Sequence, residues 1–159
     1  MDTKWFISTL ALLFFSLSAH SINSKENYIA CNLIFLDGLY TKDSSLEKYF
    51  LIDTNLDHVK EIGSQIEGSG NKSELDNSIN NSYIWVDITN TYFGPNKEIH
   101  GMKLYSYNLN RETLFLSEQM DNYFQGKKLF SLSSEWKCIL SNMEDINSRI
   151  REKLNNRKI

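Results

Sequence analysis

Two cysteines, one near each end of the chain, constrain the fold more than any other feature of this sequence. Cys31 and Cys138 both lie in apolar, strand-like segments, 28–35 and 135–140. In an oxidising compartment such a pair is most simply a disulfide, which would fasten the first strand to the last across about 107 residues. Two free buried thiols or one redox-active cysteine are the alternatives, although no Cys-x-x-Cys motif marks an activated thiolate.

The start of the chain predicts export into such a compartment. The apolar run 5–19 follows Lys4, and Ala19-His20-Ser21 places small residues two apart, which is the layout of a secretory signal peptide. The run is shorter than the roughly 20 residues of a spanning helix, so a retained membrane anchor is the weaker alternative. We predict cleavage near Ser21 and a periplasmic or secreted protein.

Between the cysteines, short apolar runs alternate with turn residues, which is typical of antiparallel β structure. Six to eight strands joined by hairpins favour a mainly β fold, either a small antiparallel barrel or a sandwich. The predicted strands are 28–35, 49–53, 58–62, 83–88, 98–107, 109–116, and a last segment that runs from 129–132 into 135–140.

Four connecting or buried segments complete this prediction. Residues 63–82, rich in Ser, Asn and Gly, are expected to form a long surface loop. Residues 83–88 are apolar at nearly every position and are expected to be buried on both faces. The only proline lies in 93–96, a predicted turn, and 118–128 is a polar stretch between strands.

The last part of the chain changes to a helical pattern. Ser141 and Glu144 fit a capping box, and apolar residues then recur at helical spacing, which predicts a helix over 142–155. The predicted organisation is a signal peptide at 1–21, a β-rich domain at 22–140, and an amphipathic helix with a basic tail at 141–159.

The charge of this tail differs from that of the rest of the chain. A pI near 5.6 argues against nucleic-acid binding, which needs a basic surface. The tail is basic, whereas the remaining chain is acidic. The position of the basic residues at the end of the predicted helix is explained either by the helix dipole or by contact with an acidic partner or a membrane surface. The five basic residues are Arg149, Arg151, Lys153, Arg157 and Lys158.

No recognisable motif predicts a catalytic residue, a cofactor or a metal ligand. Asp53, Asn55 and Asp57 resemble the start of a calcium loop, but His58 stands where that loop needs Gly, so a hairpin turn is the better interpretation. His58 and His100 belong to no motif, and no Gly-x-Ser-x-Gly elbow is present. A pair of carboxylates brought together by folding would not be visible in the sequence.

A set of short patterns resembles small exported bacterial proteins of uncharacterised function. In those, an Ile-Asp hairpin and an Asn/Asp-Arg-x-Thr strand lie between two terminal cysteines. The resemblance implies a periplasmic β-rich fold and supplies no catalytic residues; the basic C-terminal helix is additional to it. The matching residues are Ile52-Asp53 followed by Val59, then Leu109-Asn110-Arg111-Glu112-Thr113-Leu114, and Trp136-Lys137-Cys138.

These observations predict an exported, non-catalytic β-domain that binds an envelope component or a protein partner. A cell-envelope hydrolase with an unrecognised carboxylate or histidine site is the alternative. A third hypothesis is a protein held at a membrane surface by its C-terminal helix. No nucleic-acid partner and no cofactor are expected.

Overall fold

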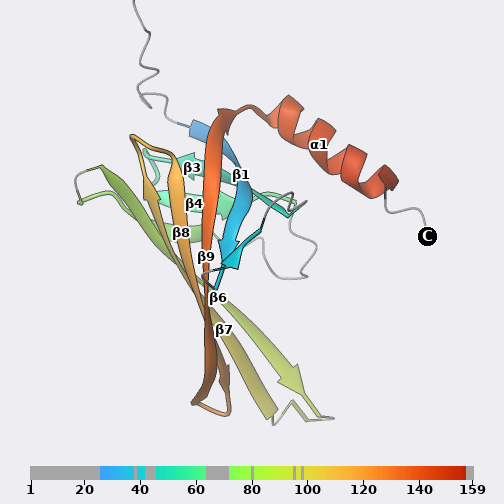
Figure 1. Ribbon diagram of the computed structural model, residues 1–159. Helices are drawn as coiled ribbons and strands as arrows, with labels where there is room; N and C mark the ends of the chain where they lie inside the picture. Colours follow the sequence, from blue (N-terminus) through green and yellow to red (C-terminus); the bar gives the residue numbers. More distant parts are fainter. Residues whose placement is uncertain are drawn as a thin grey trace, which may run out of the picture.

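The computed structural model describes residues 26–37, 39–41, 46–63, 72–79, 81–94, 96–97 and 99–156. The predicted signal peptide, 1–21, lies outside these residues. In the described part of the chain, a ring of antiparallel strands forms a barrel, and one helix packs against the outside of it (Figure 1).

Eight of the nine described strands close the barrel. The ring runs β1-β3-β4-β5-β6-β7-β8-β9 and returns to β1, while β2 pairs with the end of β1 outside the ring. The predicted mainly β fold, with a small antiparallel barrel and a C-terminal helix, is therefore confirmed. The elements are β1 (Glu26–Leu36), β2 (Leu39–Tyr40), β3 (Glu47–Asp53), β4 (His58–Glu61), β5 (Lys72–Asp76), β6 (Ser82–Phe93), β7 (Ile99–Asn110), β8 (Phe115–Phe124), β9 (Lys127–Ser141) and α1 (Met143–Asn156).

The predicted disulfide lies on the seam that closes this ring. Cys31 of β1 and Cys138 of β9 are directly opposite each other in the strand register, with their Cα atoms 3.9 Å apart, and they form a disulfide. Both side chains are fully buried. The prediction that a bridge fastens the first strand of the domain to the last is confirmed.

Large side chains fill the barrel, as expected for eight strands, whose interior is just wide enough for side chains. Phe50 of β3 packs edge-on against Trp85 and Tyr107, with ring centroids 5.3 and 5.6 Å away, and the latter two rings stack at 4.9 Å. Strand alternation turns every second residue inward. The buried interior set is Ile29, Cys31, Leu33, Phe50, Ile52, Val59, Leu75, Tyr83, Trp85, Tyr107, Leu109, Leu116, Trp136 and Cys138.

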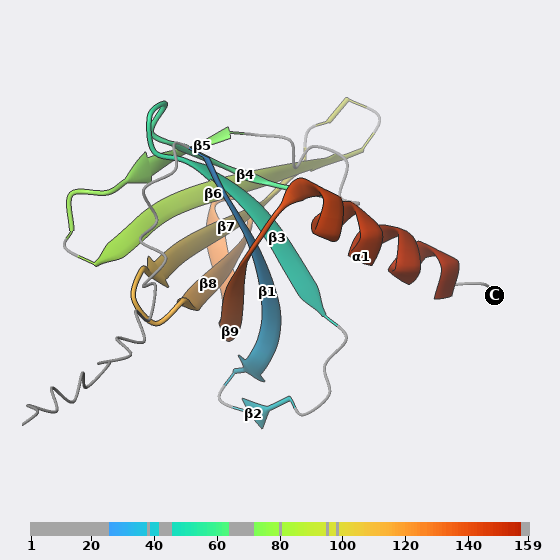
Figure 2. The ribbon, with the colours of Figure 1, turned by 90° about the horizontal axis from the view of Figure 1, so that it is seen from above.

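Helix α1 covers the outer face of β1 and β3, as seen from above in Figure 2. Ile146 is fully buried against Ala30 and Tyr49, and Ile150 packs against the same cluster. Gly63 has a φ of 69°, and a Cβ there would come within 2.6 Å of the Ile150 side chain, so this position needs glycine. The helix thus closes a second, smaller core outside the barrel.

The start of α1 differs by one residue from the predicted capping box. Asn142 is the cap, because its Oδ1 accepts a hydrogen bond from the Asp145 backbone N–H at 2.9 Å. Ser141 instead donates its hydroxyl to Asp145 Oδ2 at 2.7 Å. The predicted helix over 142–155 matches α1, whereas the capping role predicted for Ser141 and Glu144 is wrong.

The residues with a calcium-loop pattern form the hairpin turn between β3 and β4. Asp53 Oδ1 accepts hydrogen bonds from the backbone N–H groups of Asn55 and Leu56, at 2.9 and 3.1 Å. Asp57 adopts a φ of 47°, which Asp tolerates better than most residues. The predicted strand–turn–strand over 49–62 is confirmed.

Part of the predicted surface loop 63–82 is a strand. β5 lies within it and pairs with both β4 and β6, filling the gap between them in the barrel. Its sequence looks like a loop because Leu75 is its one large apolar residue and its neighbours are polar. Residues 64–71 and residue 80 of this segment lie outside the described residues.

Three further predictions about β6 to β9 are wrong. Residues 83–88 are buried on one face only, since Tyr83 and Trp85 face the core whereas Val86 and Ile88 are exposed. Residues 109–116 are not one strand but the end of β7, a turn over 111–114 and the start of β8, with Asn110 Oδ1 accepting hydrogen bonds from two backbone N–H groups of the turn. The polar stretch 118–128, which was predicted to lie between strands, belongs to β8, β9 and the turn between them. Its sequence did not indicate a strand because both strand faces there are largely polar or exposed.

Replacing both cysteines, Cys31→Ala with Cys138→Ala, is expected to lower the free energy of unfolding by about 2–4 kcal/mol, because the unfolded chain is released from a closed loop of more than 100 residues. Urea unfolding monitored by tryptophan fluorescence measures this difference. The double variant should also show a steeper dependence on urea, as its unfolded state is more expanded. An unchanged free energy of unfolding would show that strand pairing alone holds the seam.

Candidate binding surface and the buried polar cluster

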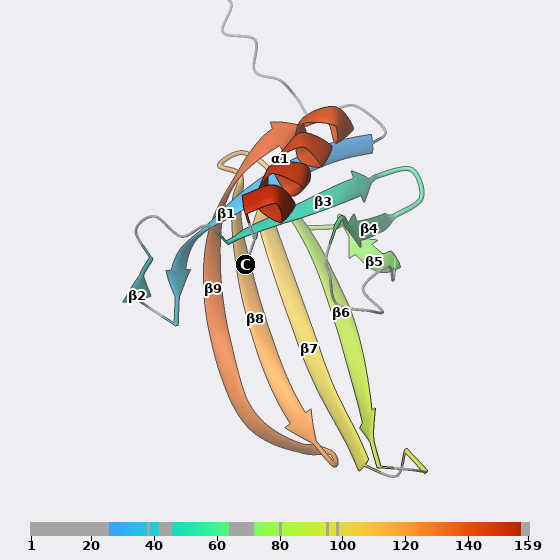
Figure 3. The same ribbon diagram turned by 90° about the vertical axis from the view of Figure 1, so that its right-hand side faces the viewer.

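Strands β6 to β9 project beyond the barrel as a four-stranded sheet (Figure 3). In the described part of the chain, β5 pairs with β6 only at Ile84 and Trp85, and β1 pairs with β9 only from Ser134 onward. Past these points the four strands pair only with one another. We call this part the distal sheet; it comprises 86–93 of β6, 99–106 of β7, 119–124 of β8 and 127–133 of β9.

One face of the distal sheet continues the inner face of the barrel and carries exposed aromatic side chains. Register places Phe124 opposite Gly101, and Phe130 opposite Asn122, on this face. The Phe93 ring lies against Gly101, where a Cβ would come within 3.4 Å of it. These three phenylalanines are 49, 40 and 47% exposed, in the order Phe93, Phe124 and Phe130. We call them the distal phenylalanines.

Lysines surround the distal phenylalanines, although the net charge of the whole chain is negative. Lys103 shares their face, opposite Asn122 in the register, and Lys127 lies opposite Phe124. Lys97 lies in the turn after β6. Lys128 pairs with Asp121 at 2.9 Å. The end of the sheet is therefore both apolar and basic.

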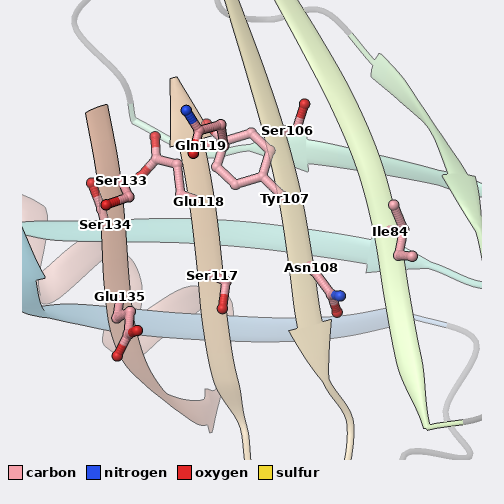
Figure 4. Close-up of a pocket in the computed structure, with 10 residues that line it drawn as sticks. All are labelled: Ile84, Ser106, Tyr107, Asn108, Ser117, Glu118, Gln119, Ser133, Ser134 and Glu135. Carbon is pink, nitrogen blue, oxygen red and sulfur yellow. The ribbon is translucent and has the colours of Figure 1, made fainter. Parts of the chain in front are cut away.

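The opposite face of the distal sheet also exposes apolar side chains, namely Val86, Ile88 and Tyr92. Where this face meets the barrel wall, it bears a shallow depression of about 340 Å³ (Figure 4). Short side chains cause it, because serines of three neighbouring strands do not fill the twisted surface. Beside it, Asp121 accepts hydrogen bonds from Lys128, Ser131 and Gln119, which lower its pKa to about 2. The lining residues are Ile84, Ser106, Tyr107, Asn108, Ser117, Glu118, Gln119, Ser133, Ser134 and Glu135.

Inside the barrel, a lysine and a glutamate form a buried ion pair that sequence reasoning missed. Lys48 Nζ lies 2.5 Å from Glu118 Oε1 and 3.3 Å from the Tyr107 hydroxyl. Trp136 Nε1 donates to the other carboxylate oxygen at 2.8 Å. The ammonium also lies 5.1–5.4 Å from the ring centroids of Tyr105, Tyr107 and Trp136. Both charges are therefore satisfied within the protein.

Glu61 adds a second carboxyl group to this environment. Burial raises its pKa above the ordinary value of 4.5, and the charges of Glu118 and Asp87 raise it further against the opposing effect of Lys48. Burial of Tyr105, together with the charges of Glu118, Glu61 and Asp87, raises the pKa of its hydroxyl group as well. A carboxylic acid with a raised pKa near a charged carboxylate is the pattern of an acid–base pair, and it is also what an enclosed polar cluster produces.

The two histidines singled out in the sequence do not share a site. His58 begins β4 in the barrel, where Nδ1 lies 3.3 Å from the Leu56 carbonyl oxygen. His100 lies at the start of β7, in the part of the distal sheet that is away from the barrel, and stacks on Tyr92 with ring centroids 5.0 Å apart. In the described residues, no group of three or more His, Cys, Asp or Glu side chains is placed to hold a metal ion.

Two of the basic residues of the C-terminal helix are engaged with the barrel wall. Lys153 and Arg149 lie 2.8 and 3.6 Å from the Glu47 carboxylate, which also accepts a hydrogen bond from the Tyr49 hydroxyl. Burial opposes ionisation of Glu47, but these hydrogen bonds and charges outweigh it and lower its pKa. Arg151 is exposed, while Arg157 and Lys158 lie outside the described residues. A partner or membrane contact through these five residues stays a prediction.

The residues that carry the resemblance to small exported bacterial proteins lie in a turn and in the core. Asn110 caps the turn between β7 and β8, and Arg111 stacks on the ring of Tyr83 at 4.8 Å. Ile52 and Val59 are opposite each other in the β3–β4 hairpin and point into the core. Within the described residues, no helix has the length and apolar content needed to cross a bilayer.

We predict strong energetic coupling within the buried ion pair. Lys48→Met and Glu118→Gln should each destabilise the protein, by about 3 kcal/mol when a buried charge loses its partner. The double variant leaves no unpaired charge, and the introduced amide oxygen still accepts from Trp136, so its loss should be smaller than the sum by about 2 kcal/mol. Urea unfolding of the four proteins of this cycle measures the coupling. Additive losses would contradict a direct ion pair.

The raised pKa of Glu61 predicts a pH-dependent loss of folding stability. Because the folded chain holds this proton more tightly than the unfolded chain, stability is lost as pH rises above 4.5 toward the folded-state pKa. Glu61→Gln removes this loss, so the variant should gain stability relative to the original protein over that interval. Thermal unfolding at several pH values measures the difference, with exposed Glu112→Gln as the control. A difference that does not change with pH would contradict the burial of this carboxyl group.

No protein-family model, curated protein or solved structure matches this chain. The resemblance to small exported bacterial proteins therefore stays a prediction.

Proposed function

We propose that this is an exported, non-catalytic β-domain that binds a protein partner of the cell envelope through its distal sheet. The observation that carries the proposal is the exposed apolar surface of the distal phenylalanines. Soluble monomers bury large aromatic side chains where they can, and an exposed group of them is typical of an interaction site. These three side chains do not hold the barrel together, because they lie past its last closing strand pair.

The chemistry of the surface favours one kind of partner. Lys103, Lys127 and Lys97 lie around the phenylalanines, and none of the three takes part in an ion pair described above. A protein surface with apolar side chains flanked by carboxylates would complement both features. A lipid surface fits less well, since Lys97 and Lys127 lie in or beside the end turns and would have to enter the bilayer ahead of the rings.

Export of the chain is part of the same proposal. The disulfide at the β1–β9 seam is consistent with an oxidising compartment, and the layout of residues 1–21 supports a secretory route. These two observations support the proposed periplasmic or secreted localisation after cleavage near Ser21.

A cell-envelope hydrolase remains the second candidate, because Glu61 and Glu118 lie in one electrostatic environment. The contacts of Glu118 speak against it. Both of its oxygens are occupied, by Lys48 and Trp136, and the residue is only 6% exposed. A nucleophile or general base has to reach a substrate, so we assign this cluster to barrel stability.

Photo-crosslinking in the native cell tests the binding proposal. A photoreactive phenylalanine analogue at Phe130 should give a discrete, heavier protein adduct. The same analogue at Phe115 should give none, because Phe115 is similarly exposed but lies at the barrel end of β8 under Lys137. Adducts of equal yield at both positions, or labelling of lipid alone, would contradict the proposal.

Charge reversal supplies the matched control for partner chemistry. Lys103→Glu with Lys127→Glu should abolish the Phe130 adduct, whereas Lys137→Glu on the barrel should leave it in place. All of these side chains are exposed, so thermal unfolding midpoints should change little. An adduct that survives the double reversal would show that the partner surface is not acidic.

A further inference from the structure

The distal sheet has two open edges, and they differ in how they are protected. An open edge exposes backbone N–H and C=O groups that can pair with another strand, so proteins usually block it with lysine, proline or a bulge. In the described part of the chain, one edge is β6 from 88 to 93 and the other is β9 from 127 to 132.

The β9 edge carries two of these protective features. Lys127 and Lys128 place two charges at its end. The register then skips Leu129, since Tyr123 pairs with Lys128 while Asn122 pairs with Phe130, which is a bulge. This edge is therefore poorly suited to accept a further strand.

The β6 edge carries neither feature. Its sequence from 88 to 93, Ile-Thr-Asn-Thr-Tyr-Phe, has no charge and no proline and is rich in β-branched and aromatic residues. Tyr92 stacks on His100, and Asn90 Oδ1 lies 2.8 Å from His100 Nε2, so both side chains lie over β7. The backbone at the edge stays uncovered by them.

The backbone groups of alternate residues point outward along this edge. The Arg111 N–H donates to the Asn81 carbonyl, which fixes the odd-numbered residues of β6 as those bonded to β7. In agreement, the Ile88 N–H donates to its neighbour's side chain, Asp87 Oδ1, at 2.8 Å instead of to β7. Ile88, Asn90 and Tyr92 therefore point their N–H and C=O groups toward the open edge, and the Ile88 N–H would exchange its bond to Asp87 for one to a pairing strand.

This strand is complementary to itself. In an antiparallel pair centred on Asn90, Ile88 of one copy lies opposite Tyr92 of the other, and Thr89 lies opposite Thr91. Aromatic with β-branched and threonine with threonine are favourable cross-strand pairs. No charge meets a like charge, and the outward-facing residues form the hydrogen-bonded pairs.

We propose that a second copy of this chain pairs with the first through β6, antiparallel and two-fold symmetric about Asn90, to join the two distal sheets into one. The contact uses the backbone edge of β6, and Phe93 is the one distal phenylalanine on that strand. Because the pairing needs neither Phe124, Phe130 nor the lysines, it can be tested separately from the proposed function. A pairing of about six residues from each chain is small compared with the roughly 1,200–2,000 Å² of a stable interface, so the dimer is weak and concentration-dependent.

Sedimentation velocity on the chain from residue 22 onward tests the dimer. The mass should rise from monomer toward dimer as concentration increases to about 0.5 mM. Asn90→Lys puts two like charges at the symmetry centre and should keep the protein monomeric. Leu129→Lys, at the other edge, should leave dimerisation unchanged. A monomer at every concentration, or loss of the dimer only in Leu129→Lys, would overturn the proposal.

Cysteine pairs test the register separately from affinity. Thr89→Cys mixed with Thr91→Cys should form an intermolecular disulfide under mild oxidation, whereas each variant alone should give much less. These residues form the non-hydrogen-bonded pair, whose side chains are closest. A covalent dimer formed equally well by Thr89→Cys alone would overturn this register and indicate pairing centred on residue 89.

Discussion

The pairing of β1 with β9 closes the barrel, and the rest of the molecule depends on that closure. Eight registered pairs and the disulfide between Cys31 and Cys138 hold the two strands together. Once the ring is closed, Leu33 and Trp136 lie opposite each other at the β1–β9 seam, and Glu118 lies close enough to Lys48 to form an ion pair. The buried ion pair is stable only there, because each charge needs the other as its partner away from water.

Unequal strand lengths then determine which part of the sheet projects beyond the barrel. β3, β4 and β5 have seven, four and five residues, whereas β6 to β9 have between ten and fifteen. A closed barrel of this size can use only part of the longer strands, so their remainder must project with no sheet packed against either face. The aromatic residues on that remainder stay exposed because nothing in the barrel can cover them.

The sequence predicted the features that depend on local pattern or on counting. Two cysteines allow one pairing, and the spacing of Met143, Ile146 and Ile150 defines a helical stripe whatever the helix packs against. The predictions failed where burial depends on distant partners. Leu75 alone is too weak an apolar signal to identify β5, and Val86 and Ile88 look like core residues although no layer covers them. The Lys48–Glu118 pair leaves no signal, because 70 residues separate its members.

The two edges of the distal sheet differ in whether they carry residues that prevent pairing with another strand. Lys127, Lys128 and the bulge at Leu129 contribute little to any core, yet together they make the β9 edge a poor template. Had both edges been selected only for solubility, β6 would be expected to carry similar features between Ile88 and Phe93. It carries none, while its long neighbour β7 keeps it extended past the barrel. An edge left open beside one that is blocked is better explained by pairing than by chance.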